Sequence, residues 1–180
     1  MPRLILVTGL PGTGKTTLAS ALVRRLNATY LRIDAVETAI QVARGDHQQV
    51  GAEGYVVAHF LAGSNLRLGQ DVVVDAVCPV PESRTGWAET AAANGGQLIM
   101  FQTCLPDVAE HRRRVELREP DMPGQQVPDW QWVQSLDWSP WDEQRDGPCT
   151  VVDTTSSADA LAAALAELGS RPAHASAPPK

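Results

Sequence analysis

Short hydrophobic runs alternate along this chain with longer stretches in which apolar residues recur every three or four positions. The runs are almost continuously apolar, as expected for strands that are covered on both faces of a parallel sheet. The sequence predicts five such strands, at Arg3–Thr8, Thr29–Asp34, Asp71–Ala76, Gln97–Cys104 and Cys149–Thr154. This alternation is typical of an α/β fold in which crossover helices cover the sheet.

Helical spacing fills the stretches between the runs. It is clearest in Lys15–Leu26, and in Gly54–Leu68 it places Val57, Phe60, Leu61 and Leu68 on one side. A helical region rich in Ala, Val and Gln precedes Gly54, and further helices are predicted at 83–94, 105–119 and 155–169, of which the last is expected to end at Gly169.

Two segments depart from this pattern. Residues 119–128, EPDMPGQQVP, contain three prolines and are predicted to form a mobile loop or lid. Residues 170–180 are small, polar and rich in proline, which predicts a disordered tail. We therefore expect one domain over residues 1–169, in keeping with the length of 180 residues.

Composition and charge exclude several classes of protein. With 43% hydrophobic residues, no run of the length of a membrane span and no signal-peptide pattern, the chain is expected to be a soluble, cytoplasmic protein. The net charge of −6 disfavours nucleic acid as the main partner. The cysteines (Cys78, Cys104 and Cys149) lack the spacing of a zinc site or a disulfide framework. The sequence does not predict an oligomeric state.

The strongest motif is the glycine-rich stretch VTGLPGTGKTT, residues 7–17. It fits the P-loop pattern, and it follows a predicted strand and opens a predicted helix, as that pattern requires. Glycines let consecutive backbone amides form an anion nest, to which the helix N-terminus adds its field. The motif predicts a site for ATP and Mg²⁺, formed by Gly9, Pro11, Gly12, Thr13, Gly14, Lys15, Thr16 and Thr17. Lys15 would reach the β- and γ-phosphates, and the Thr16 hydroxyl would bind Mg²⁺.

Carboxylates follow several of the predicted strands, and the carboxyl ends of parallel strands share one edge of the sheet. Asp34 is our candidate for orienting an acceptor hydroxyl and taking its proton, with helix capping as the alternative. Asp75 ends the VVVD run and would bind Mg²⁺ or the substrate; alternatively it is only a solvated strand end. Asp153 is expected to be structural or to lie near the purine.

Arginine and tryptophan supply the remaining candidates. Arg114 and Arg118, four residues apart on one predicted helix before the lid, could swing onto the γ-phosphate, or they belong to a solvated basic face. Arg84 and Trp87 are expected to line an acceptor pocket. The four tryptophans between residues 130 and 141 are interpreted as a small core that docks the lid.

Several of these segments together resemble small bacterial P-loop kinases of the AAA-type ATP-binding family, related to adenylylsulfate kinase, chloramphenicol phosphotransferase, gluconate kinase and the zeta toxins. The matching segments are GLPGTGKTTLA, RID at the end of the second strand, NLRLGQDVVVDAVCPVPESRTGW, AEHRRRVELRE and WSPWDE with VVDT. The resemblance implies a three-layer sandwich, a parallel sheet of order 2-3-1-4-5 and a mobile lid after the fourth strand. It also implies Mg-ATP as phosphate donor, with Asp34 as acceptor base and Lys15, Thr16, Arg114 and Arg118 around the phosphates.

The function expected from these features is an ATP-dependent kinase that phosphorylates a hydroxyl group of a small metabolite or antibiotic-like molecule. Two alternatives remain at this level. One is an ATP-binding regulatory protein with slow hydrolysis, and the other is a kinase acting on the 5′-hydroxyl of a nucleotide or polynucleotide. The acidic charge of the chain disfavours the polynucleotide kinase.

Overall fold

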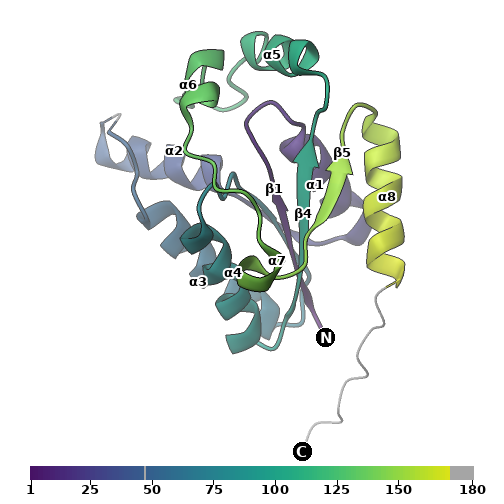
Figure 1. Ribbon diagram of the computed structural model, residues 1–180. Coiled ribbons are helices and arrows are strands. Elements are labelled where there is room, and N and C mark those ends of the chain that lie inside the picture. Colours follow the sequence, from purple (N-terminus) through teal and green to yellow (C-terminus); the bar gives the residue numbers. More distant parts are fainter. Residues whose placement is uncertain (47, 171–180) are drawn as a thin grey trace, which may run out of the picture.

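Five strands form a single parallel sheet at the centre of the molecule (Figure 1). The computed structural model describes residues 1–46 and 48–170. The strands are β1 (Arg3–Thr8), β2 (Thr29–Arg32), β3 (Val72–Asp75), β4 (Gln97–Cys104) and β5 (Thr150–Asp153), in the order β2-β3-β1-β4-β5. All four neighbouring pairs are parallel, so the predicted fold class and strand order are confirmed.

Helices cover both faces of this sheet. They are α1 (Lys15–Leu26), α2 (Ile33–Arg44), α3 (Glu53–Arg67), α4 (Pro81–Ala93), α5 (Val108–Glu116), α6 (Trp130–Ser135), α7 (Glu143–Asp146) and α8 (Ser157–Ser170). Their ends carry the local signals that helices need: the Asp107 side chain accepts hydrogen bonds from two amides of the first turn of α5, and Asn27, which caps the end of α1, adopts the left-handed conformation. Helix α8 continues through Gly169, so the predicted end at that glycine is wrong by one residue.

Two hydrophobic cores result from the alternation of side chains along the strands. Leu4 and Leu6 of β1 point to the face covered by α3 and α4, while Ile5 and Val7 point to the face covered by α1 and α8. Both cores are closed to solvent, which explains why the strands are apolar at nearly every position. The expected three-layer sandwich is therefore present.

The carboxyl ends of the strands lie together at the upper edge of the sheet in Figure 1, below α5 and α6. No described residue between α5 and α6 belongs to a helix or strand, and the predicted lid at residues 119–128 falls in this connection. Of the tail predicted at residues 170–180, Ser170 closes α8 and the remainder lies outside the described residues.

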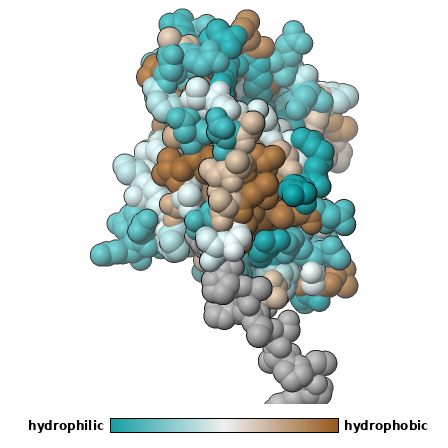
Figure 2. Space-filling view, turned by 90° about the vertical axis from the view of Figure 1, so that its right-hand side faces the viewer, coloured by the Kyte–Doolittle hydropathy of each residue, from teal (hydrophilic) through white to brown (hydrophobic). Residues whose placement is uncertain are grey.

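The side that carries α8 is shown in Figure 2, where apolar surface gathers in the middle of the view. Leu161 and Leu165 of this helix are half-buried and pack against the core that α1 shares. Among the described helices, none is both long enough and apolar enough to span a bilayer.

Candidate active site

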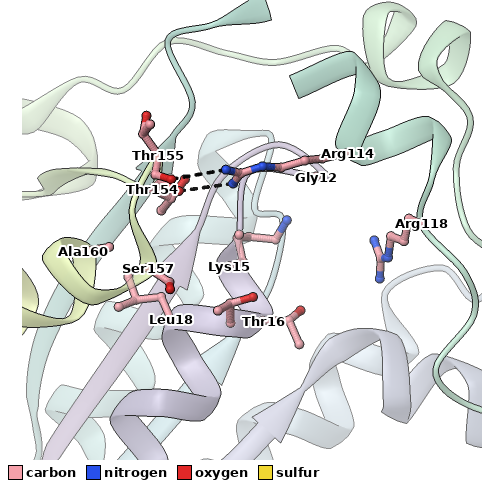
Figure 3. Close-up of a pocket in the computed structure, with 12 residues that line it drawn as sticks. Gly12, Lys15, Thr16, Leu18, Arg114, Arg118, Thr154, Thr155, Ser157 and Ala160 are labelled. Atoms are coloured by element: carbon pink, nitrogen blue, oxygen red, sulfur yellow. Dashed lines mark hydrogen bonds between the residues drawn. The ribbon is translucent and has the colours of Figure 1, made fainter. Parts of the chain in front are cut away.

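The glycine-rich loop connects β1 to α1 at the upper edge of the sheet, as the motif predicts. Gly12 and Gly14 have φ angles of +82° and +85°, in the left-handed region that favours glycine. Such residues within a turn let neighbouring amides converge into an anion nest. A cavity of about 450 Å³ opens beside the loop and is lined from it by Gly12, Gly14, Lys15, Thr16 and Thr17 (Figure 3).

The loop residues that do not line the cavity contact the neighbouring strand β4, helix α5 and the residue that follows β5. The Thr13 hydroxyl lies 2.7 Å from the Thr103 hydroxyl of β4, and the Thr154 hydroxyl lies 2.6 Å from the Thr13 carbonyl. His111 Nε2 donates to the Pro11 carbonyl at 2.7 Å, which ties α5 to the loop. Gly9 approaches Thr103 so closely that a Cβ atom would collide with it. These contacts hold the loop in its conformation through bonds within the protein.

Lys15 is the one lysine among the described residues, and its side chain extends into the cavity (Figure 3). It is only 8% exposed, and its Nζ donates to the Leu10 carbonyl at 3.0 Å. Burial lowers the pKa of Lys15, and the nearby carboxylates of Asp75 and Asp34 partly offset that effect. A compact ammonium in this place can contact the terminal phosphates of a nucleotide.

Asp75 lies at the end of β3, directly beside the loop. Its Oδ2 accepts hydrogen bonds from the Thr16 hydroxyl at 2.7 Å and the Tyr30 hydroxyl at 3.0 Å, and the residue is 4% exposed. It is thus not a solvated strand end. Mg²⁺ prefers hard oxygen ligands and takes few of them from the protein, so a hydroxyl and a carboxylate next to a phosphate site fit this ion. Thr16 and Asp75 would hold it.

Two arginines enter the cavity from the side of α5. Arg114 lies above Lys15 in Figure 3, donates to the carbonyl oxygens of Thr154 (3.2 Å) and Thr155 (3.4 Å), and pairs with Glu110 at 2.8 Å. Arg118 also lines the cavity and lies to the right of Lys15 in the same view. The prediction of a shared helix face is wrong, because α5 ends at Glu116 and Arg118 follows in the connection to α6. The cavity nevertheless brings both side chains together.

Asp34 lies in the first turn of α2, since β2 ends at Arg32, two residues before the predicted end. No side-chain capping bond is present at this helix, so Asp34 does not cap it. Its Oδ2 instead accepts hydrogen bonds from Arg118 (3.2 Å), Gln125 (3.4 Å) and Arg32 (3.4 Å). The side chain remains 40% exposed. The carboxylate thus stands at the border of the cavity, with one of its arginines inside it.

Glu37 lies one helical turn after Asp34 and packs against Gly54 at the start of α3. No described residue forms a hydrogen bond or an ion pair with its carboxylate. Burial, together with the charge of Asp34, raises the pKa of Glu37 to about 7. Glu37 belongs to none of the motifs described above, and its helical spacing from Asp34 is the signal that the sequence offers for it.

The structure does not bring Arg84 to this site. Its side chain is fully buried and pairs with Asp146 at 2.8 Å, while its other donors reach the carbonyl oxygens of Cys78, Pro79, Ser139 and Pro140. The rings of Trp138 and Trp141 lie over the guanidinium group at 5.6 and 4.8 Å. With every donor engaged inside the protein, the prediction that Arg84 binds the acceptor is wrong. Trp87 is also fully buried, in the core below α3 and α4.

The tryptophans after the lid therefore pack in two separate places. Trp138 and Trp141 cover Arg84, whereas the Trp130 ring contacts the edge of His111 on α5, at 5.1 Å between ring centres. Asp153 is exposed, and its carboxylate accepts bonds from the amide and hydroxyl of Thr155, which fits the structural role expected for it.

Comparison with known proteins agrees with this geometry. Residues 4–139 match the family described as AAA domain. A stretch of 63 residues is 41% identical to a proteasome-activating nucleotidase of Methanosarcina mazei; it makes up 35% of this chain and spans 15% of the length of that relative.

Solved structures of kinases share the fold over nearly the whole chain. A sugar kinase from Janibacter sp. HTCC2649 superposes with a TM-score of 0.69 at 18% identity, covering 98% of this chain and 100% of its own. A gluconokinase from Sinorhizobium meliloti has a TM-score of 0.60 at 19% identity, and the coverage is 94% and 98%. An APS kinase from Mycobacterium tuberculosis, solved with AMPPNP and APS, has a TM-score of 0.62 at 17% identity with the same coverage.

The family match covers about three quarters of the chain and includes the whole glycine-rich loop, and the structural similarity extends over nearly all of it. This protein belongs to the AAA domain family and has the fold of the P-loop kinases.

Proposed function

We propose that this protein is an ATP-dependent kinase that transfers a phosphoryl group to a hydroxyl group of a small molecule. One observation carries the proposal: Arg118 lines the cavity at the glycine-rich loop and at the same time donates to Asp34 at 3.2 Å. The carboxylate is therefore one side chain away from the phosphate site. A kinase needs this juxtaposition, because its acceptor hydroxyl must stand in line with the terminal phosphorus.

Each residue has a defined task in this reaction. The loop amides and Lys15 bind the phosphates, and Thr16 and Asp75 hold the Mg²⁺ that neutralises charge on them. A bond forms between the acceptor oxygen and the γ-phosphorus while the bond to the β,γ-bridging oxygen breaks, and ADP leaves. Asp34 orients the hydroxyl and takes its proton, and Arg118 stabilises the negative charge that spreads over the transferred group.

The charges around Asp34 favour an acceptor that is neutral or carries an amine. The two guanidinium groups next to it, those of Arg32 and Arg118, are already paired with carboxylates. Glu37 adds a carboxylate without a cationic partner in the described part of the chain. Above pH 7, where Glu37 is charged, an acidic acceptor would meet repulsion here, whereas an ammonium group would gain a charge-assisted hydrogen bond.

Two substitutions test the proposal. Lys15→Ala is expected to abolish both Mg-AMPPNP binding, measured by calorimetry, and ATP turnover, because the phosphates lose their ammonium. Asp34→Asn is expected to keep the affinity for Mg-AMPPNP within about threefold while lowering acceptor-dependent ADP release by roughly 10²–10⁴, the usual contribution of a general base. Glu53→Gln, in an exposed pair with Arg44 on the neighbouring helices, is the matched control.

Full acceptor-dependent turnover in Asp34→Asn would remove this residue from the reaction. ATP hydrolysis that no hydroxyl compound accelerates would instead favour a regulatory NTPase. Acceleration by an oligonucleotide alone would favour the 5′-hydroxyl kinase.

A further inference from the structure

Arg32 is an arginine at the end of a buried strand, a place where the other strands of the sheet carry apolar, hydroxyl or acidic residues. Its side chain is 8% exposed and lies among three carboxylates that come from different parts of the chain. We propose that Arg32 is a positioning residue. Its hydrogen bonds to Asp121 hold the connection between α5 and α6 in place beside Asp34. The catalytic consequence rests on the proposed function, whereas the structural part does not.

The contacts of Arg32 are unequal in strength. One nitrogen, Nη1, donates to both carboxylate oxygens of Asp121, at 3.0 and 2.8 Å. The second nitrogen, Nη2, reaches Asp34 at 3.4 Å. The third, Nε, lies 3.9 Å from Asp75 and has no hydrogen-bond partner in the described structure. The guanidinium is thus anchored mainly by Asp121, and it holds the pKa of that carboxyl below its usual range.

Gln125 links Asp121 to Asp34 by hydrogen bonds. The Asp121 amide donates to Gln125 Oε1 at 2.9 Å, and Gln125 Nε2 donates to Asp34 at 3.4 Å. Together with the contact between Arg32 and Asp34, these bonds close a ring of four residues. Gln125 is only 7% exposed although it lies in an irregular connection, so the ring is packed into the protein.

The same connection also carries Arg118, the arginine that lines the phosphate cavity. When the ring holds the connection in place, Arg118 and Asp34 stay at the border of the cavity. Without the ring, the connection has no helix or strand of its own to restrain it, so Arg118 and the side chain of Asp34 are held less firmly. A misplacement of about 1 Å can cost roughly 10²-fold in rate.

Only an arginine fits the geometry at position 32. Its planar fork can serve Asp121 and Asp34 at once, whereas the single ammonium of a lysine cannot keep both bonds at these distances. Arg32→Lys therefore keeps the charge and breaks the ring. Asp121→Asn weakens the ring from the other side, because the amide keeps one acceptor oxygen but loses the charge and the second oxygen; the Asp121 side chain is 55% exposed, so this variant leaves no cavity in the core.

Hydrogen exchange of the amides, followed by mass spectrometry with Mg-AMPPNP bound, tests the structural part. We expect exchange of residues 118–127 to accelerate about tenfold in Arg32→Lys and in Asp121→Asn, with the sheet unchanged, because local opening follows the loss of its restraints. Glu53→Gln breaks a surface ion pair of similar length, 2.7 Å, and is expected to leave this segment unchanged. Unchanged exchange in both ring variants would overturn the proposal.

Kinetics test the positioning role itself. Each ring variant is expected to lower kcat by about 10–100-fold and to leave the KM for ATP within about threefold, since the glycine-rich loop is untouched. The double variant should be no worse than the poorer single variant, because both break one unit. Additive losses, or a change in the KM for ATP alone, would overturn the proposal. Loosened exchange together with full transfer by Asp34→Asn would refute the proposed function and leave the structural role of Arg32 standing.

Discussion

Glu37 shows, at the scale of a single residue, how burial can change the pKa of a carboxyl group. It is half-buried between α2 and α3, and its only strong electrostatic neighbour on α2 is Asp34, which is also negative. Burial first, and Asp34 second, raise the pKa of Glu37 to about 7, against an ordinary value of 4.5. Between these two pH values the folded protein keeps a proton that the unfolded chain has released. Folding stability must therefore fall as the pH rises through this interval.

We predict that Glu37→Gln stabilises the protein at pH 8, where the wild-type residue is charged, and makes little difference at pH 4.5–5, where it is protonated. The gain at pH 8 should be about 1 kcal/mol, after a discount for the solvent that screens a half-buried group. Urea unfolding at the two pH values measures it. An equal effect of the substitution at both values would contradict the assignment.

At the scale of elements, α3 shows where hydrophobic periodicity misleads. Val57, Phe60, Leu61 and Leu68 do lie toward one side, but that side faces solvent, and Phe60 is 75% exposed. The buried side consists of Gly54, Ala58, Ala62, Gly63 and Leu66. Small residues let a helix approach its neighbours closely. Because glycine and alanine are only weakly hydrophobic, a search for hydrophobic residues does not identify the side that they form as the buried one. The sequence pattern therefore grouped the residues correctly and did not reveal which group is buried.

Substitutions on the two sides of α3 should differ accordingly. Leu66→Ala, at a position that is 2% exposed, is expected to cost about 2–4 kcal/mol, because it leaves a cavity in the core. Phe60→Ser on the exposed side is expected to stay within about 0.5 kcal/mol of the wild type. Chemical denaturation of both variants gives the comparison, and a larger loss for Phe60→Ser would show that this side is covered in solution.

At the scale of the whole molecule, Arg84 joins segments that lie far apart in the sequence. It connects α4 and the turn that follows β3 to residues 139–146, which follow the lid and lead into β5. Both members of its ion pair with Asp146 are fully buried. Arg84→Met would leave Asp146 with Arg145 as its remaining cationic partner and would leave four carbonyl oxygens without their donor, so we expect a loss of about 3–5 kcal/mol in the free energy of unfolding.

The affinity of folded Arg84→Met for Mg-AMPPNP, measured by calorimetry below its unfolding temperature, should equal that of the wild type. A stable variant with altered affinity would contradict the structural role. The stability of Arg84→Lys is expected to lie between those of the wild type and Arg84→Met, because an ammonium can pair with Asp146 but cannot reach all four carbonyl oxygens.

The sequence and the structure agree best where the signal is local. The bounds of β1, β4 and α1 match the prediction residue for residue, and the glycine-rich loop with Lys15 and Thr16 lies where its motif placed it. The ring around Asp34 could not be predicted, because Arg32 and Asp121 are 89 positions apart and meet only through the path of the chain. The support of the loop by Thr103, Thr154 and His111 was missed for the same reason.

Gly12 has a consequence that extends beyond phosphate chemistry. A methyl group there would collide with Val115 on α5, so the loop and that helix touch with only a hydrogen atom to spare. The identity of residue 12 is therefore linked to the position of α5: an alanine here would have enough space only if α5 lay farther from the loop. In a homologue that carries alanine here, we would look first for a displaced helix, and only afterwards for a changed nucleotide.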